Sequence, residues 1–332
     1  MNAGLFKDAI LSYMIEFRQL RYFVAIVDAG SLTRASALLN IAQPSLSQQM
    51  ADLEATVGAK LLDRSVRGVT ATASGQAVYR HAQTILHLRE QTADVARGAG
   101  KEIGGRVRLG LPSSIAMVLA APLVKNLTQA FPDILLELYE SPSTYLVAQL
   151  FDERVDLSLL VDSSPSPGLE VRALMEESIY FVQSAKTTSR KAKQAVRLAD
   201  LTDFPMILTT RATTLRQLID SACSVSATKL QVRAEASSIQ TLLTVVAEGS
   251  LSTLVPYSAL SWHPTTSALR LWPVSPTIAR PVSLAWSRSS VMSPATECVR
   301  SAIIQVASEL IHQGIWKGAV LAMHAENIKP SA

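Results

Sequence analysis

The chain has 332 residues, of which 48% are hydrophobic and 17% charged, and its formal net charge is +4. Its length suggests two domains, since one domain typically has about 100–200 residues, and its composition excludes a disordered or fibrous protein. The longest apolar stretch, residues 115–124, contains Pro122 and is shorter than the roughly 20 residues of a membrane span. The N-terminus lacks a basic and apolar leader, so we expect a soluble cytoplasmic protein without membrane contact.

A first helix is predicted near the N-terminus, after residues 1–13, in which we expect little order. Apolar residues recur there at helical spacing: Phe17, Leu20, Phe23, Val24 and Val27. We expect these side chains to form a buried face that supports the helices that follow.

Residues 31–57 predict two helices joined by a tight turn. Ser31 is a plausible N-cap for the first helix, and Pro44 fits the first turn of the second. One face of each helix is apolar: Leu32, Ala35 and Leu39, then Leu46, Met50, Leu53 and Val57. The other face of the second helix is polar: Gln43, Ser45, Ser47, Gln48 and Asp52. Such a face suits the reading of base edges in a major groove; a plain helical hairpin in water is the alternative.

Residues 61–70 predict a short two-stranded wing after Gly58, which ends the second helix as a C-cap glycine does. Arg64 and Arg67 lie three positions apart in the wing, where guanidinium groups hold phosphates without reading sequence. Charge alone does not identify a nucleic-acid protein, because residues 14–98 contain nine Arg and Lys against seven Asp and Glu. The placement of the arginines carries the prediction instead.

Two runs of the sequence carry a family resemblance: AQPSLSQQMADLE at 42–54 and LLDRSVRGVTAT at 61–72. Through them, residues 17–75 closely resemble the LysR-type transcriptional regulators. SLSQQ and the RGV wing are most similar to the nitrogen assimilation control branch. Two departures are Gln48, where the family often has Arg, and Ala71, where Leu is usual. Gln48 therefore favours contacts with adenine. For a double-stranded DNA operator we predict these contact residues: Arg34, Gln43, Pro44, Ser45, Ser47, Gln48, Arg64 and Arg67.

Residues 72–95 predict one long helix with an approximate a/d pattern: Val78, Ile85, Leu88 and Val95. Packing on its own domain is the alternative, but a single apolar seam flanked by charged residues favours pairing with a second copy, which the resemblance also implies. We predict a winged helix-turn-helix domain at 14–72, a linker and dimerisation helix at 73–97, and an effector-binding domain at 105–312. The C-terminal domains of such dimers are expected to complete a homotetramer.

From Arg106 onward strands alternate with helices, which is typical of an α/β domain with a largely parallel sheet. Segments 177–182 and 280–286 are apolar enough to cross between two lobes. Two lobes with two crossings form a periplasmic-binding-protein-like domain, which the resemblance implies as well. We expect lobe I at about 105–180 and 283–312 and lobe II at about 181–282, with the helix after residue 113 bent or broken at Pro122.

Small hydroxyl residues follow three of the predicted strands, where ligands of open α/β sheets bind: Ser113 with Ser114, Thr209 with Thr210, and Ser237 with Ser238. Helix N-termini have unpaired N–H groups and partial positive charge, so three of them facing one cleft would hold a small anionic effector. Arg211 would add a bidentate partner for a carboxylate. Plain N-capping is the alternative at each junction.

Little in the sequence indicates catalysis. The five histidines, at 81, 87, 263, 312 and 324, lack metal-ligand spacing, and Cys223 and Cys298 favour reduced thiols over a redox switch. We therefore predict a regulator that is not an enzyme, uses no cofactor or metal, and works with RNA polymerase. The alternatives are a constitutive, ligand-independent regulator, a solute-binding protein for transport, and an enzyme on a two-lobed scaffold.

Overall fold

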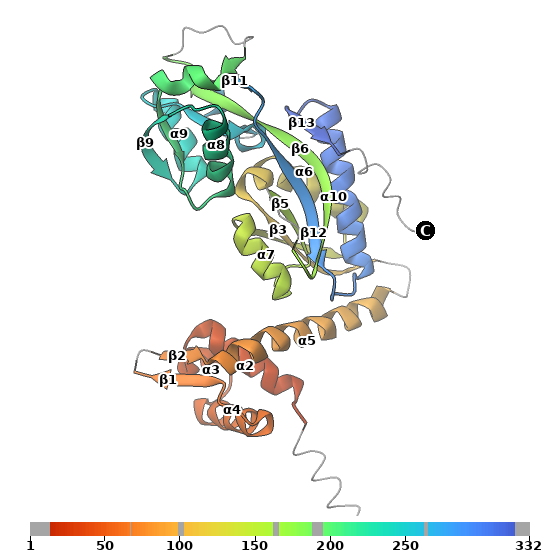
Figure 1. The fold of residues 1–332 in the computed structure, drawn as a ribbon. Helices are drawn as coiled ribbons and strands as arrows, with labels where there is room; N and C mark the ends of the chain where they lie inside the picture. Colours follow the sequence, from red (N-terminus) through yellow and green to blue (C-terminus); the bar gives the residue numbers. More distant parts are fainter. Residues whose placement is uncertain are drawn as a thin grey trace, which may run out of the picture. The chain divides into compact units, whose positions relative to one another are not determined.

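The computed structural model describes residues 14–66, 68–98, 103–161, 166–187, 195–261 and 265–322 (Figure 1). These residues form two compact units, one made mainly of residues up to 96 and one mainly of residues from 97 onward. The predicted lack of order in 1–13, the contact residue Arg67 and the side chain of Val95 lie outside the described part. Among the described helices, none has the length and apolar character needed to cross a bilayer.

The first unit is the predicted winged helix-turn-helix followed by a long helix. Its core contains the expected apolar faces, with Phe23, Leu46 and Leu53 fully buried. One residue of the first predicted face was placed wrongly: Phe17 is 53% exposed, because it opens the first turn of its helix. The elements are α2 Phe17–Ala29, α3 Leu32–Leu39, α4 Gln43–Val57, β1 Leu62–Ser65, β2 Gly68–Ala71 and α5 Ala73–Gly98.

Local chemistry places each of these elements as the sequence suggested. Ser31 caps α3 by accepting the Arg34 N–H, and Gly58 ends α4 in the left-handed conformation. The wing is held close to the body, since the Val69 N–H donates to the Gly30 carbonyl over 3.0 Å. A side chain at residue 68 would collide with that same carbonyl, so glycine is required there for the wing to dock.

The second unit has two lobes connected by two long antiparallel strands, β6 Leu169–Ser184 and β12 Ala279–Ser287, which run side by side in Figure 1. The main sheet has the order β4-β3-β5-β12-β6-β11-β7, and β10 and β13 also pair with β6. Strands β8 and β9 form a separate parallel pair. The remaining elements are β3 Gly105–Leu111, α6 Ser113–Ala130, β4 Ile134–Glu140, α7 Ser143–Phe151, β5 Leu157–Val161, β7 Val196–Arg197, η1 Leu198–Asp203, β8 Pro205–Thr209, α8 Thr214–Val225, β9 Gln231–Ala236, α9 Ile239–Glu248, β10 Thr253–Pro256, η2 Tyr257–Leu260, η3 Thr266–Ala268, β11 Leu269–Ser275, α10 Pro294–His312 and β13 Ala319–Leu321.

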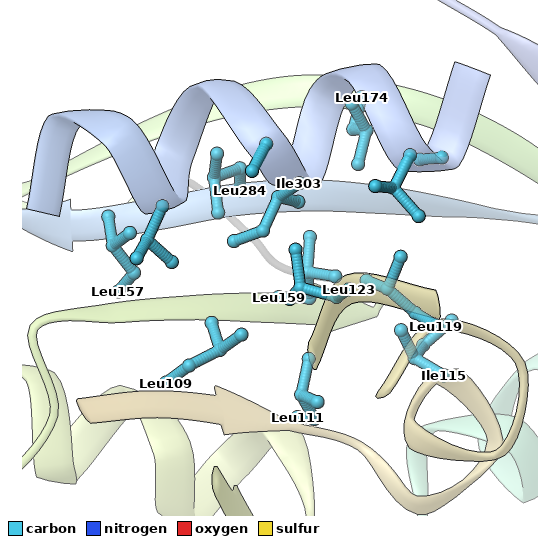
Figure 2. Close-up of a cluster of buried hydrophobic side chains, with 14 of the residues drawn as sticks. Leu109, Leu111, Ile115, Leu119, Leu123, Leu157, Leu159, Leu174, Leu284 and Ile303 are labelled. Carbon is cyan, nitrogen blue, oxygen red and sulfur yellow. The ribbon is translucent and has the colours of Figure 1, made fainter. Parts of the chain in front are cut away.

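Each lobe has its own apolar core. In Figure 2, side chains of α6 and α10 pack against β3, β5 and β12, and Leu123, Leu159 and Ile303 lie together in the middle. The predicted break at Pro122 is not found, since α6 is continuous from Ser113 to Ala130. Proline removes one helical hydrogen bond, but the buried side chains on the same helix keep both halves on the sheet.

Candidate functional site

Helix α4 presents a polar surface to solvent while its opposite side is fixed in the core. Gln43, Pro44, Ser45 and Gln48 are exposed and Ser47 is half-buried, whereas Leu46 on the opposite face is fully buried. The residue before the helix is Ala42, which cannot cap it with a side chain. The first N–H groups of α4 therefore stay available for an anion such as a phosphate oxygen.

Three hydrogen bonds tie the exposed side chains of α4 to their neighbours. Thr33 Oγ1 donates to Gln43 Oε1 over 3.2 Å, and Arg64 Nη1 of the wing donates to Ser47 Oγ over 2.9 Å. Gln48 Nε2 donates to Asp52 Oδ1, one helical turn further on, over 2.8 Å. The wing arginine and the polar face of α4 thus form one continuous surface.

Two of the arginines predicted to hold phosphates, Arg34 and Arg64, have no carboxylate partner among the described residues. Both residues are exposed. Arg67 lies outside the described residues. A guanidinium without a carboxylate partner can form charge-assisted hydrogen bonds to phosphate at full strength.

An apolar groove lies where α5 begins. It has a volume of about 270 Å³ and is lined by residues of α2, α4 and α5, and by the segment before α2: Ile15, Phe17, Leu20, Val57, Val78, His81, Ala82 and Ile85. Further along α5, Ile85 is 39% and Leu88 37% exposed. Two members of the predicted dimer seam are therefore only partly covered by their own chain.

In the second unit, one cavity of about 100 Å³ is lined by residues of both lobes. The beginnings of four helices, α6, α7, α8 and α9, line it, and most of its polar groups are hydroxyls. Of the predicted effector residues, Ser113, Ser114 and Thr209 line this cavity, together with Ser237. Thr210, Arg211 and Ser238 are not among its lining residues.

Each helix that begins at the cavity is capped in its own way, and this explains why Ser238 is not part of the lining. Ser238 caps α9 by accepting the Thr241 N–H, so its oxygen is used by the helix. α8 is capped by Thr213, whose hydroxyl lies 2.8 Å from that of Thr209. At α6 the capping position is Pro112, which leaves both serines after it inside the first turn.

The charged group of the cavity is Arg280, which the sequence analysis assigned only to an apolar crossing strand. Arg280 is 2% exposed and Glu177, opposite it on β6, is 0% exposed. Arg280 donates to Glu177 Oε2 from Nε (3.1 Å) and Nη2 (2.8 Å), and Nη2 also lies 2.8 Å from Ser114 Oγ. Glu177 Oε1 accepts the Ser258 N–H and the Trp316 indole N–H, each over 2.9 Å.

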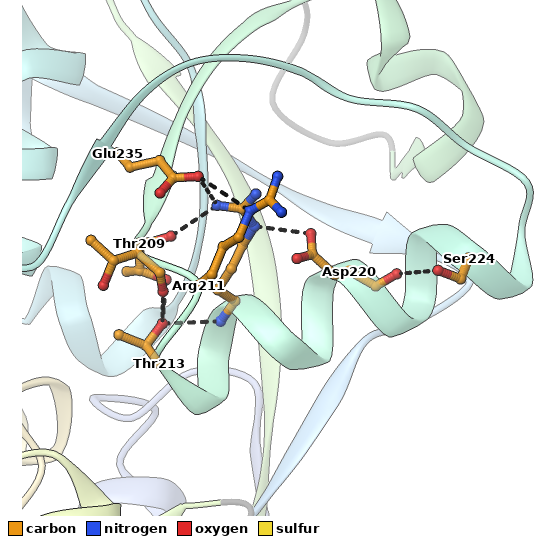
Figure 3. A network of polar contacts seen from close by, with 8 residues as sticks. Thr209, Arg211, Thr213, Asp220, Ser224 and Glu235 are labelled. Atoms are coloured by element: carbon orange, nitrogen blue, oxygen red, sulfur yellow. Dashed lines mark hydrogen bonds and ion pairs between the residues drawn. The ribbon is translucent and has the colours of Figure 1, made fainter.

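Arg211 belongs instead to another groove, which is formed by lobe II alone; Figure 3 shows the polar contacts around it. The side chain of Arg211 is 81% exposed and lies 3.9 Å from Glu235. The buried arginine of this groove is Arg216, which donates to Glu235, Asp220 and the Thr209 carbonyl. Arg216 thereby connects α8 to β8 and β9.

The remaining candidates for chemistry are metal-type clusters and the two thiols. Among the described residues, no group of three or more His, Cys, Asp or Glu side chains is arranged to hold a metal ion. Burial is the main cause that raises the pKa of the thiols of both Cys223 and Cys298. Two of the histidines, at 263 and 324, lie outside the described part.

Comparisons with known proteins agree with this architecture. Residues 17–76 match the family described as "Bacterial regulatory helix-turn-helix protein, lysR family", and residues 100–308 match the "LysR substrate binding domain". The nitrogen assimilation regulatory protein nac of Klebsiella aerogenes is 32% identical over 298 residues, 89% of this chain and 96% of that protein. The hydrogen peroxide-inducible genes activator of Haemophilus influenzae is 28% identical over 291 residues, 87% and 96% of the two proteins.

Solved structures show the same fold over nearly the whole chain. An OxyR C206 mutant of Corynebacterium glutamicum has 26% identity and a TM-score of 0.58, with 90% of this chain and 95% of that chain covered. Full-length CbnR complexed with its target DNA has 21% identity and a TM-score of 0.66, with 89% and 99% covered. The second likeness concerns the fold alone.

Proposed function

The chain belongs to the LysR family of bacterial transcriptional regulators, and on that basis we propose which residues read DNA and what the C-terminal domain binds. It is a DNA-binding regulator with an effector-binding domain. We propose that α4 reads bases through Gln43, Ser45, Ser47 and Gln48, with Pro44 at its start. Phosphates are held by Arg34, Arg64 and Arg67. The observation that carries this assignment is the exposed amide and hydroxyl face of α4, joined to the wing through Arg64 and Ser47.

The experiment is a gel-shift titration of full-length protein on duplexes of different sequence. Gln48→Ala should lower affinity for a preferred operator and leave non-specific binding almost unchanged, since base contacts carry the sequence information. Arg64→Ala should instead weaken binding to all sequences alike and reduce the salt dependence by about one phosphate contact. If Gln48→Ala left operator affinity unchanged, the assignment of α4 as the reading helix would be wrong.

In the proposed assembly, α5 pairs with α5 of a second copy and the C-terminal domains join dimers into a tetramer. Partly exposed Ile85 and Leu88 support the first contact, and the exposed apolar side chains of the edge strand β4, Leu135, Leu138 and Tyr139, support the second. The effector would shift the balance between two arrangements of the paired DNA-binding domains, and so act on RNA polymerase recruitment in the cytoplasm.

For the effector we propose a small anion in the cavity between the lobes, contacted by Ser113, Ser114 and Thr209 beside Arg280. Four helix N-termini lining one cavity favour negative charge. Three further effector residues were predicted from sequence but do not line the cavity, so they would not contact the anion directly: Thr210, Arg211 and Ser238. Thermal unfolding of the full-length protein with acetate, oxalate, sulfate or phosphate, against chloride at equal ionic strength, tests the proposal. A saturable rise in Tm with one of them is expected.

A constitutive regulator without a ligand is the second candidate, and two observations favour it. The cavity, at about 100 Å³, is well below the roughly 300–1,000 Å³ of ordinary ligand sites. The charge of Arg280 is already neutralised by Glu177. Equal Tm in all of the salts above would favour this candidate over the ligand-gated one.

A further inference from the structure

We propose that Asp52 is a positioning residue that fixes the amide of Gln48 in one orientation and thereby sets the base that α4 prefers. The inference rests on the proposed reading role of Gln48. Its starting point is the hydrogen bond from Gln48 Nε2 to Asp52 Oδ1, 2.8 Å long. The two residues are four positions apart, which places their side chains on the same side of a helix.

The chemistry of the pair leaves only one way for the amide to turn. A glutamine amide has an oxygen that accepts and a nitrogen that donates two hydrogen bonds, whereas an ionised carboxylate only accepts. The amide nitrogen must therefore face Asp52, as it does in the structure. Without such a partner, the amide of a solvent-exposed glutamine could rotate by about 180°, which exchanges the positions of its oxygen and nitrogen at little energetic cost.

The fixed orientation determines what Gln48 offers to DNA. One N–H of Nε2 is taken by Asp52, and the oxygen Oε1 and the second N–H stay available. An acceptor beside a donor is the combination that matches adenine, whose major-groove edge has the N6 amine as donor and N7 as acceptor. Guanine presents two acceptors there, so the Oε1 atom would face a like group. Asp52 thus favours adenine over guanine through Gln48.

The position of a carboxylate on this face also needs an explanation. Asp52 is half-buried on the helix that carries the exposed polar residues, and a negative charge near duplex DNA repels the phosphates. A surface pair of this type stabilises a helix by only about 0.2–0.5 kcal/mol. Stabilisation of α4 alone would not require a charged partner that also repels DNA.

The experiment measures base preference at every position of the site. Full-length wild-type protein and the variants Gln48→Ala, Asp52→Ala, Asp52→Glu and Asp63→Ala each select from a duplex library with a randomised segment, and the enriched sequences give the preference at each position. Asp63→Ala is the matched control. It removes one exposed negative charge from the same domain, on β1, without contact to Gln48. Alanine is a strong helix former, so Asp52→Ala is expected to fold.

Gln48→Ala identifies the position that Gln48 reads. At that position we expect the wild-type protein to prefer adenine over guanine by roughly tenfold or more, as for a good bidentate contact. In Asp52→Ala this preference should fall to about threefold or less. Asp52→Glu, which keeps an acceptor-only partner, should retain part of the preference. Asp63→Ala should leave it intact, although both charge-removing variants should bind all DNA more tightly.

Two results would overturn the proposal, and they differ from a failure of the reading role. Unchanged preferences in Asp52→Ala would mean that Gln48 orients itself without help. An equal loss of preference at all positions would mean that Asp52 acts on the stability of α4. If Gln48→Ala itself changed no preference, the reading role of Gln48 would fail first, and the role of Asp52 with it.

Discussion

Neutralising Glu177 should strongly destabilise the C-terminal unit, because Glu177 is the buried counter-charge of Arg280. Its carboxylate accepts two hydrogen bonds from Arg280, one from the Ser258 N–H and one from the Trp316 indole. Glu177→Gln keeps the side-chain volume but leaves the Arg280 guanidinium buried without a counter-charge. Breaking a buried pair in this way typically costs about 3–5 kcal/mol.

Urea unfolding of the full-length protein measures this effect directly. All four tryptophans lie between residues 262 and 316, so tryptophan fluorescence follows the C-terminal unit. With a urea m-value on the order of 2–3 kcal/mol/M, a loss of 3–5 kcal/mol lowers the midpoint by about 1–2.5 M. The control is Asp200→Asn, which removes the partner of Arg197 in an exposed pair (side chains 36% and 75% exposed) and should cost less than about 1 kcal/mol.

The double variant Glu177→Gln, Arg280→Met distinguishes an unpaired charge from simple loss of packing. Removal of both partners leaves no buried charge, so the double variant should be destabilised by less than the sum of the two single variants. Additive effects, or a midpoint for Glu177→Gln no lower than that of Asp200→Asn, would refute the reasoning.

Three further predictions concern a tight backbone contact, the dimer seam and the thiols. In Gly75→Ala the new Cβ would overlap a neighbouring backbone carbonyl, so the free energy of unfolding of the DNA-binding unit should fall by roughly 1–3 kcal/mol or more. In the control Gly58→Ala the new Cβ meets nothing within 4 Å, although residue 58 has φ +73°, so the fall should be only about 1 kcal/mol. Thermal unfolding followed by circular dichroism compares the two variants. Ile85→Asp should shift the protein toward monomer in analytical ultracentrifugation, whereas Leu38→Asp, at a side chain that is 75% exposed on α3, should not. Burial first, and then the Asp220 carboxylate, raise the pKa of the Cys223 thiol, so thiolate is scarce near neutral pH. Iodoacetamide at pH 8 should therefore label the native chain much more slowly than the urea-unfolded chain, and equal rates would contradict the assignment of an inert thiol.

The helix-turn-helix could be predicted from sequence because its determinants are local. The Ser31 cap, the left-handed Gly58 and the buried face of α4 all depend on residues within a few turns of one another, and such patterns are visible in a linear chain. What the sequence could not give is the partner of each exposed side chain. The bond from Arg64 to Ser47 spans 17 positions and depends on how the wing docks.

The cavity was predicted only in part, because its charged group depends on strand register. Arg280 and Glu177 are 103 positions apart and become neighbours only when β12 pairs with β6 in one register. Hydroxyl residues at the ends of predicted strands gave the helix starts correctly, but a shift of one residue decides which hydroxyl caps the helix and which faces the cavity: Ser238 caps α9, whereas Ser237 lines the cavity. An arginine inside an apolar crossing segment was the signal that could have revealed the site.

The internal pairing of Arg280 limits how tightly an anion can bind while the network stays closed. With the guanidinium neutralised by Glu177, the attraction comes mainly from helix N-termini, each contributing about 0.3–1 kcal/mol. Four of them give about 1–4 kcal/mol, which corresponds to a Kd on the order of millimolar or weaker. A micromolar effector would have to draw Arg280 away from Glu177, and the Trp316 indole bound to the same carboxylate would then change its surroundings. Tight anion binding should therefore be accompanied by a change in tryptophan emission that Trp316→Phe reduces. Micromolar binding without such a change would show that the pair stays closed and that the binding energy comes from elsewhere.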